Sequence, residues 1–266
     1  MMAKNVFVTG VSMGIGRAIA EKFLAQGYIL FGSYFKHKTE AEELVLQFGE
    51  DRVKLIGSYD FRNIDNIKTL LNRLGSFHFD AIVCNSGVFS ENDDFNHFNL
   101  EEFDRTMNCN FYAPLLLSTG LKENINPGGS IVIISSNDAY VGAFSSISYS
   151  VSKSALISLM KCLAVNFGKR NIRVNAVAPG AINTNMNTVE QMEIAPYFTP
   201  ICRVGSPEEV AKVVYFLSTD EASFVNGETI TIDGGYGAVS LLLKCEADQP
   251  LSRHIREFIN ASCEKT

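Results

Sequence analysis

The sequence has no block of basic residues, no long apolar run and no C-x-x-C pair. Lysine and arginine total 23 against 29 aspartates and glutamates, which gives a net charge of −6. Because phosphate contacts need clustered positive charge, we expect no nucleic-acid partner. A membrane-spanning helix needs roughly 20 apolar residues. The longest apolar runs, such as 131–134 and 241–243, are far shorter, so we expect no membrane span.

The cysteines show neither the pairing of a disulfide framework nor the spacing of a zinc site. Most of them stand in apolar or helical stretches, where a free cysteine packs as a small hydrophobe. The N-terminal residues run directly into a strand-like segment and leave no room for a signal peptide. We therefore expect a cytoplasmic protein without disulfides or a bound metal. The six are Cys84, Cys109, Cys162, Cys202, Cys245 and Cys263.

A length of 266 residues allows one large domain or two small ones. Apolar residues make up 46% of the chain, enough for a sizeable core. Short β-branched runs alternate with longer segments of helical periodicity, which predicts βαβ units. The expected fold is a single α/β domain with a Rossmann-type, doubly wound parallel sheet in three layers. Strands are expected at 6–9, 29–34, 53–57, 81–84, 130–135, 173–178 and 229–232, and helices at 17–26, 39–48, 63–74, 101–121, 150–167 and 207–218.

Two segments depart from this alternation. Residues 183–206 are rich in asparagine and methionine and contain Pro196 and Pro200, which is typical of a mobile lid rather than a packed helix. The second segment is the C-terminal end, where apolar residues recur with helical spacing between 251 and 259. We expect a coenzyme-binding domain over 1–238 and a helical extension over 239–266. A frayed tail is the alternative.

A glycine-rich turn joins the first expected strand to the first helix, with the sequence T-G-V-S-M-G-I-G at 9–16. Gly10 permits a tight turn, Gly14 lets the backbone approach a pyrophosphate, and Gly16 lets the helix pack close to the sheet. The helix N-terminus favours an anion. The turn therefore predicts a dinucleotide site that also includes Ser12, Met13 and Ile15. A glycine-rich turn that binds nothing is the alternative.

The end of the second strand discriminates between the two nicotinamide coenzymes. An acidic residue there would hold the ribose 2′-hydroxyl of NAD, whereas basic residues accommodate the 2′-phosphate of NADP. The strand ends at Ser33 and Tyr34, followed by Lys36 and Lys38, with no carboxylate before Glu40. We expect the lysines, helped by the Ser33 hydroxyl, to bind the phosphate of NADP(H). The alternative is a solvated basic turn.

Further polar and small residues follow the next two strands. Asp60 and Phe61 come after the third strand, and Asn85, Ser86 and Gly87 come after the fourth. Ligands of such sheets bind outside the carboxyl ends of the strands. We expect the Asp60 carboxylate to accept from the adenine amino group and Gly87 to leave room for the coenzyme. Residues of these types are also ordinary after strands.

Tyr149 and Lys153 lie four residues apart on one face of an expected helix. A free tyrosine has a pKa near ~10, and a neighbouring ammonium is expected to lower it. Tyr149 would then be a usable general acid and base. Ser136 ends the fifth strand, where its hydroxyl can bond a substrate carbonyl. The alternative is a surface pair on an amphipathic helix.

With these motifs the chain resembles the short-chain dehydrogenase/reductases, in their single-domain branch, over roughly residues 4–237. The resemblance implies that Tyr149 is the acid/base, that Ser136 positions the carbonyl and that Lys153 also holds the nicotinamide ribose. Asn110 would join a water chain to Lys153. Met13 stands where many NADP-preferring relatives carry a basic residue, so NAD(H) remains the alternative coenzyme. Further coenzyme contacts are implied at Pro179, Gly180, Ile182 and Thr184.

The resulting functional hypothesis is an NADP(H)-dependent oxidoreductase that interconverts a ketone and a secondary alcohol, assembled as a homotetramer or homodimer. The substrate is expected to be a small or medium, mainly apolar carbonyl compound such as a 3-oxoacyl thioester. Alternatives are an NAD-dependent dehydrogenase of sugars, steroids or other alcohols, an epimerase of nucleotide sugars, and a catalytically silent regulator. Besides Ser136 and Tyr149, the expected substrate contacts are Asn137, Tyr140, Phe144, Met186 and Met192. The aromatic residues in this set, Tyr140 and Phe144, could instead pack under the lid.

Overall fold

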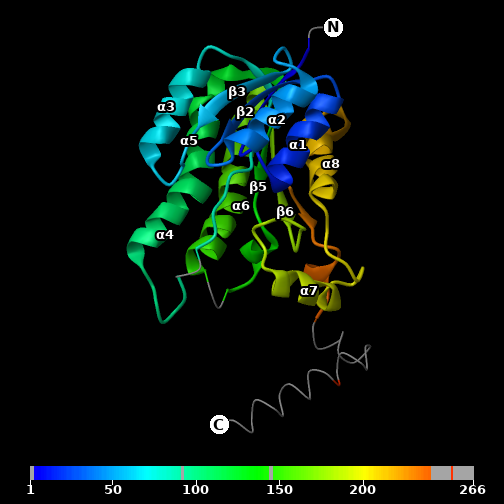
Figure 1. Cartoon of the computed structure of the whole chain (residues 1–266). Helices are drawn as coiled ribbons and strands as arrows, with labels where there is room; N and C mark the ends of the chain where they lie inside the picture. Colours follow the sequence, from blue (N-terminus) through cyan, green and yellow to red (C-terminus); the bar gives the residue numbers. More distant parts are fainter. Residues whose placement is uncertain (1–2, 91–92, 144–145, 241–252, 254–266) are drawn as a thin grey trace.

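A computed structural model describes residues 3–90, 93–143, 146–240 and 253 (Figure 1). In this part of the chain one parallel, seven-stranded sheet has the order β3-β2-β1-β4-β5-β6-β7. The strand order reverses direction between β1 and β4, which is where ligands bind in such sheets. The strands are β1 (Asn5–Thr9), β2 (Ile29–Tyr34), β3 (Val53–Ser58), β4 (Phe79–Cys84), β5 (Ile125–Ile134), β6 (Arg173–Pro179) and β7 (Thr229–Ile232).

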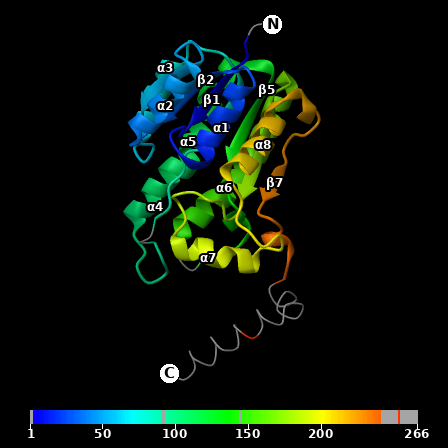
Figure 2. The same ribbon diagram turned by 45° about the vertical axis from the view of Figure 1, so that its right-hand side comes forward.

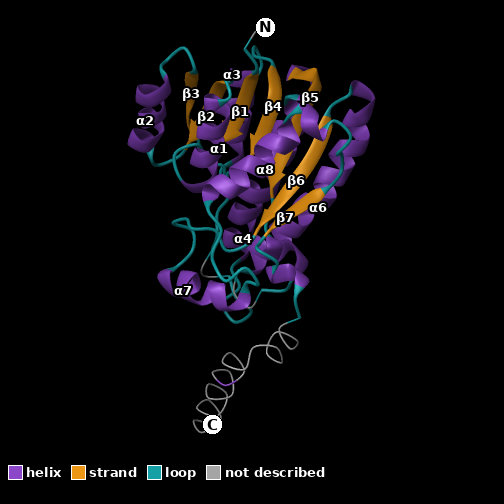
Figure 3. Ribbon diagram, turned by 90° about the vertical axis from the view of Figure 1, so that its right-hand side faces the viewer, coloured by secondary structure: helices purple, strands orange, loops and turns teal. Residues whose placement is uncertain are grey.

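Helices cover both faces of the sheet (Figure 3). One apolar core lies between the sheet and α1 (Gly14–Ala25), α2 (Lys38–Phe48) and α8 (Pro207–Ser218). The other lies between the sheet and α3 (Ile64–Leu74), α5 (Ala113–Gly120) and α6 (Ile147–Phe167). Successive residues of the central strands, such as Val6, Phe7 and Val8, are fully buried because each face is covered. The expected doubly wound, three-layer fold is confirmed.

The segment expected as one helix over 101–121 is interrupted. It forms α4 (Leu100–Met107), a π-helical turn (Asn108–Tyr112) and then α5. An α-helical bond to the carbonyl of Asn110 would have to come from residue 114, which is proline and has no N–H. The expectation of a continuous helix was therefore wrong. Single π turns of this kind are frequent at functional sites.

The segment expected as a mobile lid contains a helix, α7 (Val189–Phe198), which lies beyond the carboxyl ends of the strands (Figures 1 and 2). Thr188 and Gln191 form a capping box that satisfies the first amides of this helix. Residues 189–198 are thus helical, which was not predicted from the sequence. No residue of α7 is buried, so the helix is not part of the core.

No helix in the described part of the chain is long and apolar enough to cross a membrane. Cys84, Cys109, Cys162 and Cys202 are free thiols, and the described residues contain no cluster of potential metal ligands. Two expectations lie outside the described residues: the substrate contact of Phe144 and nearly all of the extension over 239–266.

Candidate active site

The turn between β1 and α1 is a cradle that only glycines fit. Gly10 and Gly14 have positive φ angles of +74° and +55°, and a Cβ on Gly16 would lie 1.9 Å from the carbonyl oxygen of Gly10. Met13, which precedes α1, makes no side-chain cap, and the first turn carries no acidic residue. The first amides of α1 are thus left for an anion. A diphosphate fits this turn.

The end of β4 braces the cradle. The Thr9 hydroxyl oxygen accepts from the amides of Asn85 and Ser86, each at 2.9 Å. The Asn85 side-chain amide donates to the carbonyls of Thr9 and Gly10, at 2.9 and 3.2 Å. Asn85 and Ser86 therefore lie beside the phosphate loop, as expected, and their polar groups hold the loop in shape.

The basic turn after β2 is only partly as expected. Lys36 lies with its Nζ 5.6 Å from the centre of the Phe35 ring, whereas Lys38 pairs with Glu42 at 3.3 Å. Ser33 is 1% exposed, and its carbonyl accepts from the amides of Gly10 and Val11. The expectation that Ser33 offers its hydroxyl to a 2′-phosphate was wrong because the side chain is buried inside the sheet.

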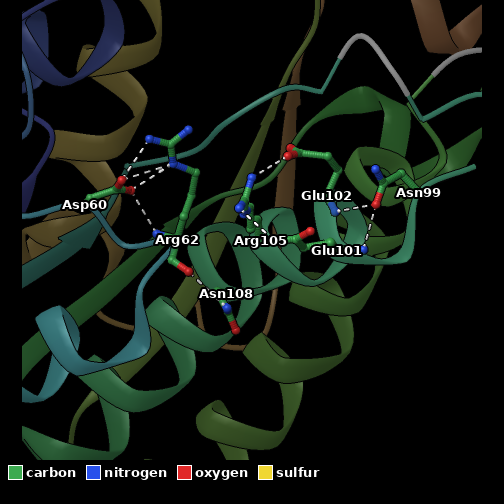
Figure 4. A network of polar contacts seen from close by, with 7 residues as sticks. All are labelled: Asp60, Arg62, Asn99, Glu101, Glu102, Arg105 and Asn108. Carbon is green, nitrogen blue, oxygen red and sulfur yellow. Dashed lines mark hydrogen bonds and ion pairs between the residues drawn. The ribbon is translucent and has the colours of Figure 1, made fainter.

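Arg62 is a functional candidate that the sequence did not reveal (Figure 4). Its guanidinium donates to both carboxylate oxygens of Asp60, at 2.8 and 2.9 Å, and these bonds lower the pKa of Asp60. The same guanidinium lies 5.5 Å from the Phe35 ring, which Lys36 also contacts. The Asp60 carboxylate is therefore already paired, and two cations flank one exposed aromatic ring at the edge of the site.

Arg62 is also tied to the helix interruption. The Asn108 side chain, at the start of the π turn, donates to the carbonyl of Arg62 at 3.0 Å (Figure 4). The preceding helix α4 is stabilised independently, because Asn99 caps its N-terminus. For the pair of Arg62 with Asp60, the one signal in the sequence is a basic residue two positions after an aspartate. The bond between Asn108 and Arg62 has no such signal, because the fold brings these distant segments together.

Tyr149, Lys153, Ser136 and Asn110 come together beyond the carboxyl ends of β4 and β5. Tyr149 and Lys153 lie one turn apart on α6, with Lys153 Nζ 5.4 Å from the centre of the Tyr149 ring. The Ser136 hydroxyl accepts from the Asp138 amide at 3.1 Å and lies close enough to the phenol to lower the pKa of Tyr149. A Cβ on Gly87 would lie 3.3 Å from Lys153 Nζ and 3.5 Å from Asn110 Oδ1. Gly87 thus leaves space beside both of these side chains.

The pKa of Tyr149 differs from the expectation. Burial raises the pKa of Tyr149 to about 12, an effect that the Ser136 hydrogen bond opposes only in part. Burial also lowers the pKa of Lys153 to about 8, and its ammonium donates to the carbonyl of Ile134 at 2.9 Å. The expectation of a lowered Tyr149 pKa was wrong because burial of the phenol outweighs any attraction by the Lys153 ammonium. Tyr149 keeps its proton at neutral pH.

Asn110 uses its side chain within the protein. Its Oδ1 accepts from the Val88 amide at 2.8 Å, and its Nδ2 donates to the Val88 carbonyl at 2.9 Å and to Ser152 Oγ at 3.1 Å. The side chain therefore ties the segment after β4 to α6. Ser135, the neighbour of Ser136, is buried and donates to the Lys153 carbonyl at 2.8 Å. Its hydroxyl is therefore used within the protein.

The expected substrate side is more open. Asn137 and Tyr140 lie in the short turn after Ser136, and Tyr140 is 54% exposed. Met186 is exposed and Met192 is half-buried in the lid segment. A residue that the sequence did not reveal is Phe89, whose ring centre lies 5.4 Å from that of Tyr149. This aromatic contact adds an apolar wall directly beside the phenol.

The turn after β6 reaches the phosphate cradle. Gly180 directly follows Pro179 and packs against the residue after β7, since a Cβ on Gly180 would lie 2.6 Å from the Cβ of Asp233. Ile182 is buried, and the next residues turn towards the cradle. A Cβ on Gly14 would lie 3.3 Å from Thr184 Cγ2, so the predicted position of Thr184 near the phosphates agrees with the geometry.

The chain matches the family model described as enoyl-(acyl carrier protein) reductase over residues 10–237. A short-chain dehydrogenase/reductase of Pestalotiopsis microspora is 34% identical, covering 87% of this chain and 94% of the relative. The 3-oxoacyl-acyl-carrier-protein reductase FabG of Aquifex aeolicus is 35% identical, covering 88% and 98%.

Solved structures agree with these relatives. The structure of BdcA in complex with NADPH has a TM-score of 0.82 at 32% identity, covering 90% of this chain and 97% of that one. A blue fluorescent protein from a metagenomic library, also in complex with NADPH, has a TM-score of 0.82 at 29% identity, covering 88% and 97%. On its sequence, its strand order and these matches, the chain belongs to the short-chain dehydrogenase/reductase family of enzymes.

Proposed function

We propose that the protein is an NADP(H)-dependent oxidoreductase that interconverts a ketone and a secondary alcohol. The observation that carries this proposal is the buried Tyr149 side chain, one turn from the buried ammonium of Lys153 and near the Ser136 hydroxyl. This group lies at the same edge of the sheet as the glycine cradle. A proton donor beside a dinucleotide site is the arrangement that carbonyl reduction needs.

In the proposed reaction a bound nicotinamide supplies or accepts the hydride at the carbonyl carbon. Tyr149 holds the proton that the carbonyl oxygen receives, and its raised pKa keeps that proton in place at neutral pH. Ser136 orients the oxygen by a hydrogen bond. Lys153, charged below about pH 8, stabilises negative charge that develops on the phenol as the proton leaves. Asn110 keeps α6 and the segment after β4 in register.

The coenzyme is proposed to be NADP(H), with NAD(H) as the alternative. Lys36 lies against Phe35 at the end of β2, where a 2′-phosphate would lie, and Arg62, which is paired with Asp60, lies against the same ring. The similar structures that contain NADPH support this preference. We propose that the phosphate loop residues hold the diphosphate, that Thr184 lies near the phosphates and that residues 179–182 contact the nicotinamide end.

The substrate is proposed to be a small or medium carbonyl compound that is mainly apolar. Phe89, Tyr140, Met186 and Met192 provide apolar or aromatic surface around the reacting oxygen or on the lid segment. Relatives named as reductases of a 3-oxoacyl carrier-protein substrate and of versicolorin support the reductive assignment. A sugar, steroid or other alcohol oxidised with NAD is the second candidate class.

One experiment tests the proposal directly. Purified protein is assayed with NADPH and with NADH against 3-oxoacyl thioesters, sugars, steroids, quinones and simple ketones, following absorbance of the reduced coenzyme. We expect turnover with NADPH on at least one apolar ketone or thioester, and weaker turnover with NADH. Bound NADPH without turnover of any substrate class would favour the silent regulator, and preferred use of NADH would contradict the coenzyme assignment.

We further propose a cytoplasmic homotetramer, with a homodimer as the alternative, built from the domain over 1–238. The extension over 239–266 is proposed to form a helix that packs on this domain or on a neighbouring subunit. Deleting residues 240–266 should then change the number of subunits in the assembly or lower the melting temperature. Unchanged values of both would show that the extension is a frayed tail.

A further inference from the structure

We propose that Asp93 is a positioning residue for Tyr149, because it holds the first turn of α6 in place from a different segment of the chain. This inference rests on the proposed role of Tyr149 as proton donor. Asp93 lies between β4 and α4 and is completely buried, which is unusual for a carboxylate. A buried carboxylate needs hydrogen-bond donors. Oδ2 has one at the start of α6, whereas Oδ1 has no partner among the described residues.

Asp93 takes two of the first amides of α6. Its Oδ2 accepts from the Ser148 amide at 2.6 Å, and its main-chain carbonyl accepts from the Ile147 amide at 2.9 Å. The first amides of a helix have no partner within the helix and are normally satisfied by a cap from the chain just before it. Here the cap comes from more than fifty residues earlier in the sequence.

The chain immediately before α6 does not provide that cap. Ser146, at the N-cap position, has a left-handed backbone with φ of 65° and makes no side-chain capping bond. The first turn of α6 also contains no acidic residue. Within the described residues, Asp93 is therefore the acceptor that sets where this helix begins, and its charge is favourable at the positive end of the helix.

The position of that first turn decides the position of the proposed proton donor. Tyr149 directly follows Ser148, the residue whose amide Asp93 binds. The same segment after β4 also contacts the phenol ring through Phe89 and is tied to α6 through Val88 and Asn110. Loss of the Asp93 contact would free the first turn to shift, and a shift of the order of 1 Å at a reacting group can reduce the rate about 100-fold.

The test compares Asp93→Ala and Asp93→Asn with the matched control Asp94→Ala. Asp94 is the next residue, and its partners among the described residues lie in its own loop: the amides of Asn96 and His97 and the His97 ring. We expect Asp93→Ala to lower kcat by about 10- to 100-fold. Asp93→Asn retains an oxygen that can accept from Ser148 and should restore kcat to within about threefold of the parent. Asp94→Ala should match the parent.

A second readout separates positioning from a general loss of structure. NADPH binding measures the folded fraction, because the phosphate cradle lies on β1 and α1, and kcat is expressed per NADPH-binding site. The proposal expects NADPH affinity to stay the same while kcat falls. Wild-type kcat in Asp93→Ala, or an equal loss in Asp93→Asn and Asp93→Ala, would overturn it.

If Asp93→Ala does not fold, the test rests on Asp93→Asn. Turnover of this variant within about threefold of the parent supports the role of Asp93 as acceptor, and a larger loss overturns that role. These outcomes are separate from failure of the proposed function. If the proposed function were wrong, the parent protein itself would turn over no carbonyl compound. A parent that is active while Asp93→Ala equals it would leave the proposed function standing and reject only the role of Asp93.

Discussion

The Nζ of Lys153 lies 5.4 Å from the centre of the Tyr149 ring, one turn further along α6. The ammonium donates to a main-chain carbonyl of β5, and both side chains are buried. Burial moves the two pKa values towards the neutral forms, to about 8 for the lysine and about 12 for the tyrosine. Tyr149 is therefore protonated at neutral pH, as a proton donor must be.

Replacing Tyr149 with phenylalanine should abolish most turnover. The change removes the hydroxyl that holds the proton and leaves the ring contact with Phe89 in place. General acid catalysis contributes about 100- to 10,000-fold, so a loss of kcat in that range is expected. NADPH affinity should be unchanged because the phosphate cradle is untouched. Steady-state kinetics and NADPH fluorescence titration measure the two quantities.

Tyr112→Phe is the matched control for this variant. Tyr112 is 41% exposed in the π turn, and within the described residues its ring contact is with Phe111. Its turnover should equal that of the parent. Near-normal turnover in Tyr149→Phe would refute the proposed role of the phenol, whatever the control shows.

The two reaction directions should respond to pH with opposite sign. Reduction needs protonated Tyr149, which persists to about pH 12, and is helped by Lys153, which loses its charge above about pH 8. The kcat of reduction should therefore be level near neutrality and fall above about pH 8. Oxidation needs the tyrosine as base, and its kcat should rise with pH over the same interval. Replacement of Lys153 by methionine should lower kcat and remove the fall near pH 8.

The coenzyme preference should depend on Lys36. Its ammonium shares the Phe35 ring with the Arg62 guanidinium, and the nearby Lys38 is paired with Glu42. Lys36→Ala should weaken NADPH by about 10- to 100-fold, as expected for a charge-assisted hydrogen bond, and leave NADH nearly unchanged. Lys38→Ala is the matched control and should affect neither. Equal weakening of both coenzymes in Lys36→Ala would contradict the NADP assignment.

The parts of the fold and site that could be predicted from sequence are those with a local signal. The strands at 29–34 and 229–232 and the helix at 207–218 agree with the structure residue for residue, because apolar periodicity and turn residues mark their ends. The glycine cradle and the spacing of Tyr149 and Lys153 are likewise local patterns. Their placement at one edge of the sheet follows from the parallel topology.

The parts that could not be predicted depend on contacts between distant segments. Arg62 next to Phe35, Phe89 against Tyr149, and the Asp93 cap on α6 each join residues whose proximity only the fold creates. The pKa of Tyr149 was predicted in the wrong direction because burial cannot be read from an i, i+4 pair. The break before Pro114 had a local signal in that proline.

Gly16 tests whether close packing shapes the coenzyme site. A Cβ there would lie 1.9 Å from the carbonyl oxygen of Gly10 and 2.4 Å from the side-chain nitrogen of Asn85. Backbone cannot yield as a flexible side chain does, so Gly16→Ala must push the turn away from α1. We expect stability to fall by about 1–3 kcal/mol, as for other overpacked sites, and NADPH binding to be largely lost. Gly75→Ala is the control, since its nearest contact would be 3.6 Å away, and it should leave both unchanged. Thermal unfolding and NADPH titration measure the two effects, and wild-type affinity in Gly16→Ala would mean that the cradle can open without losing its ligand.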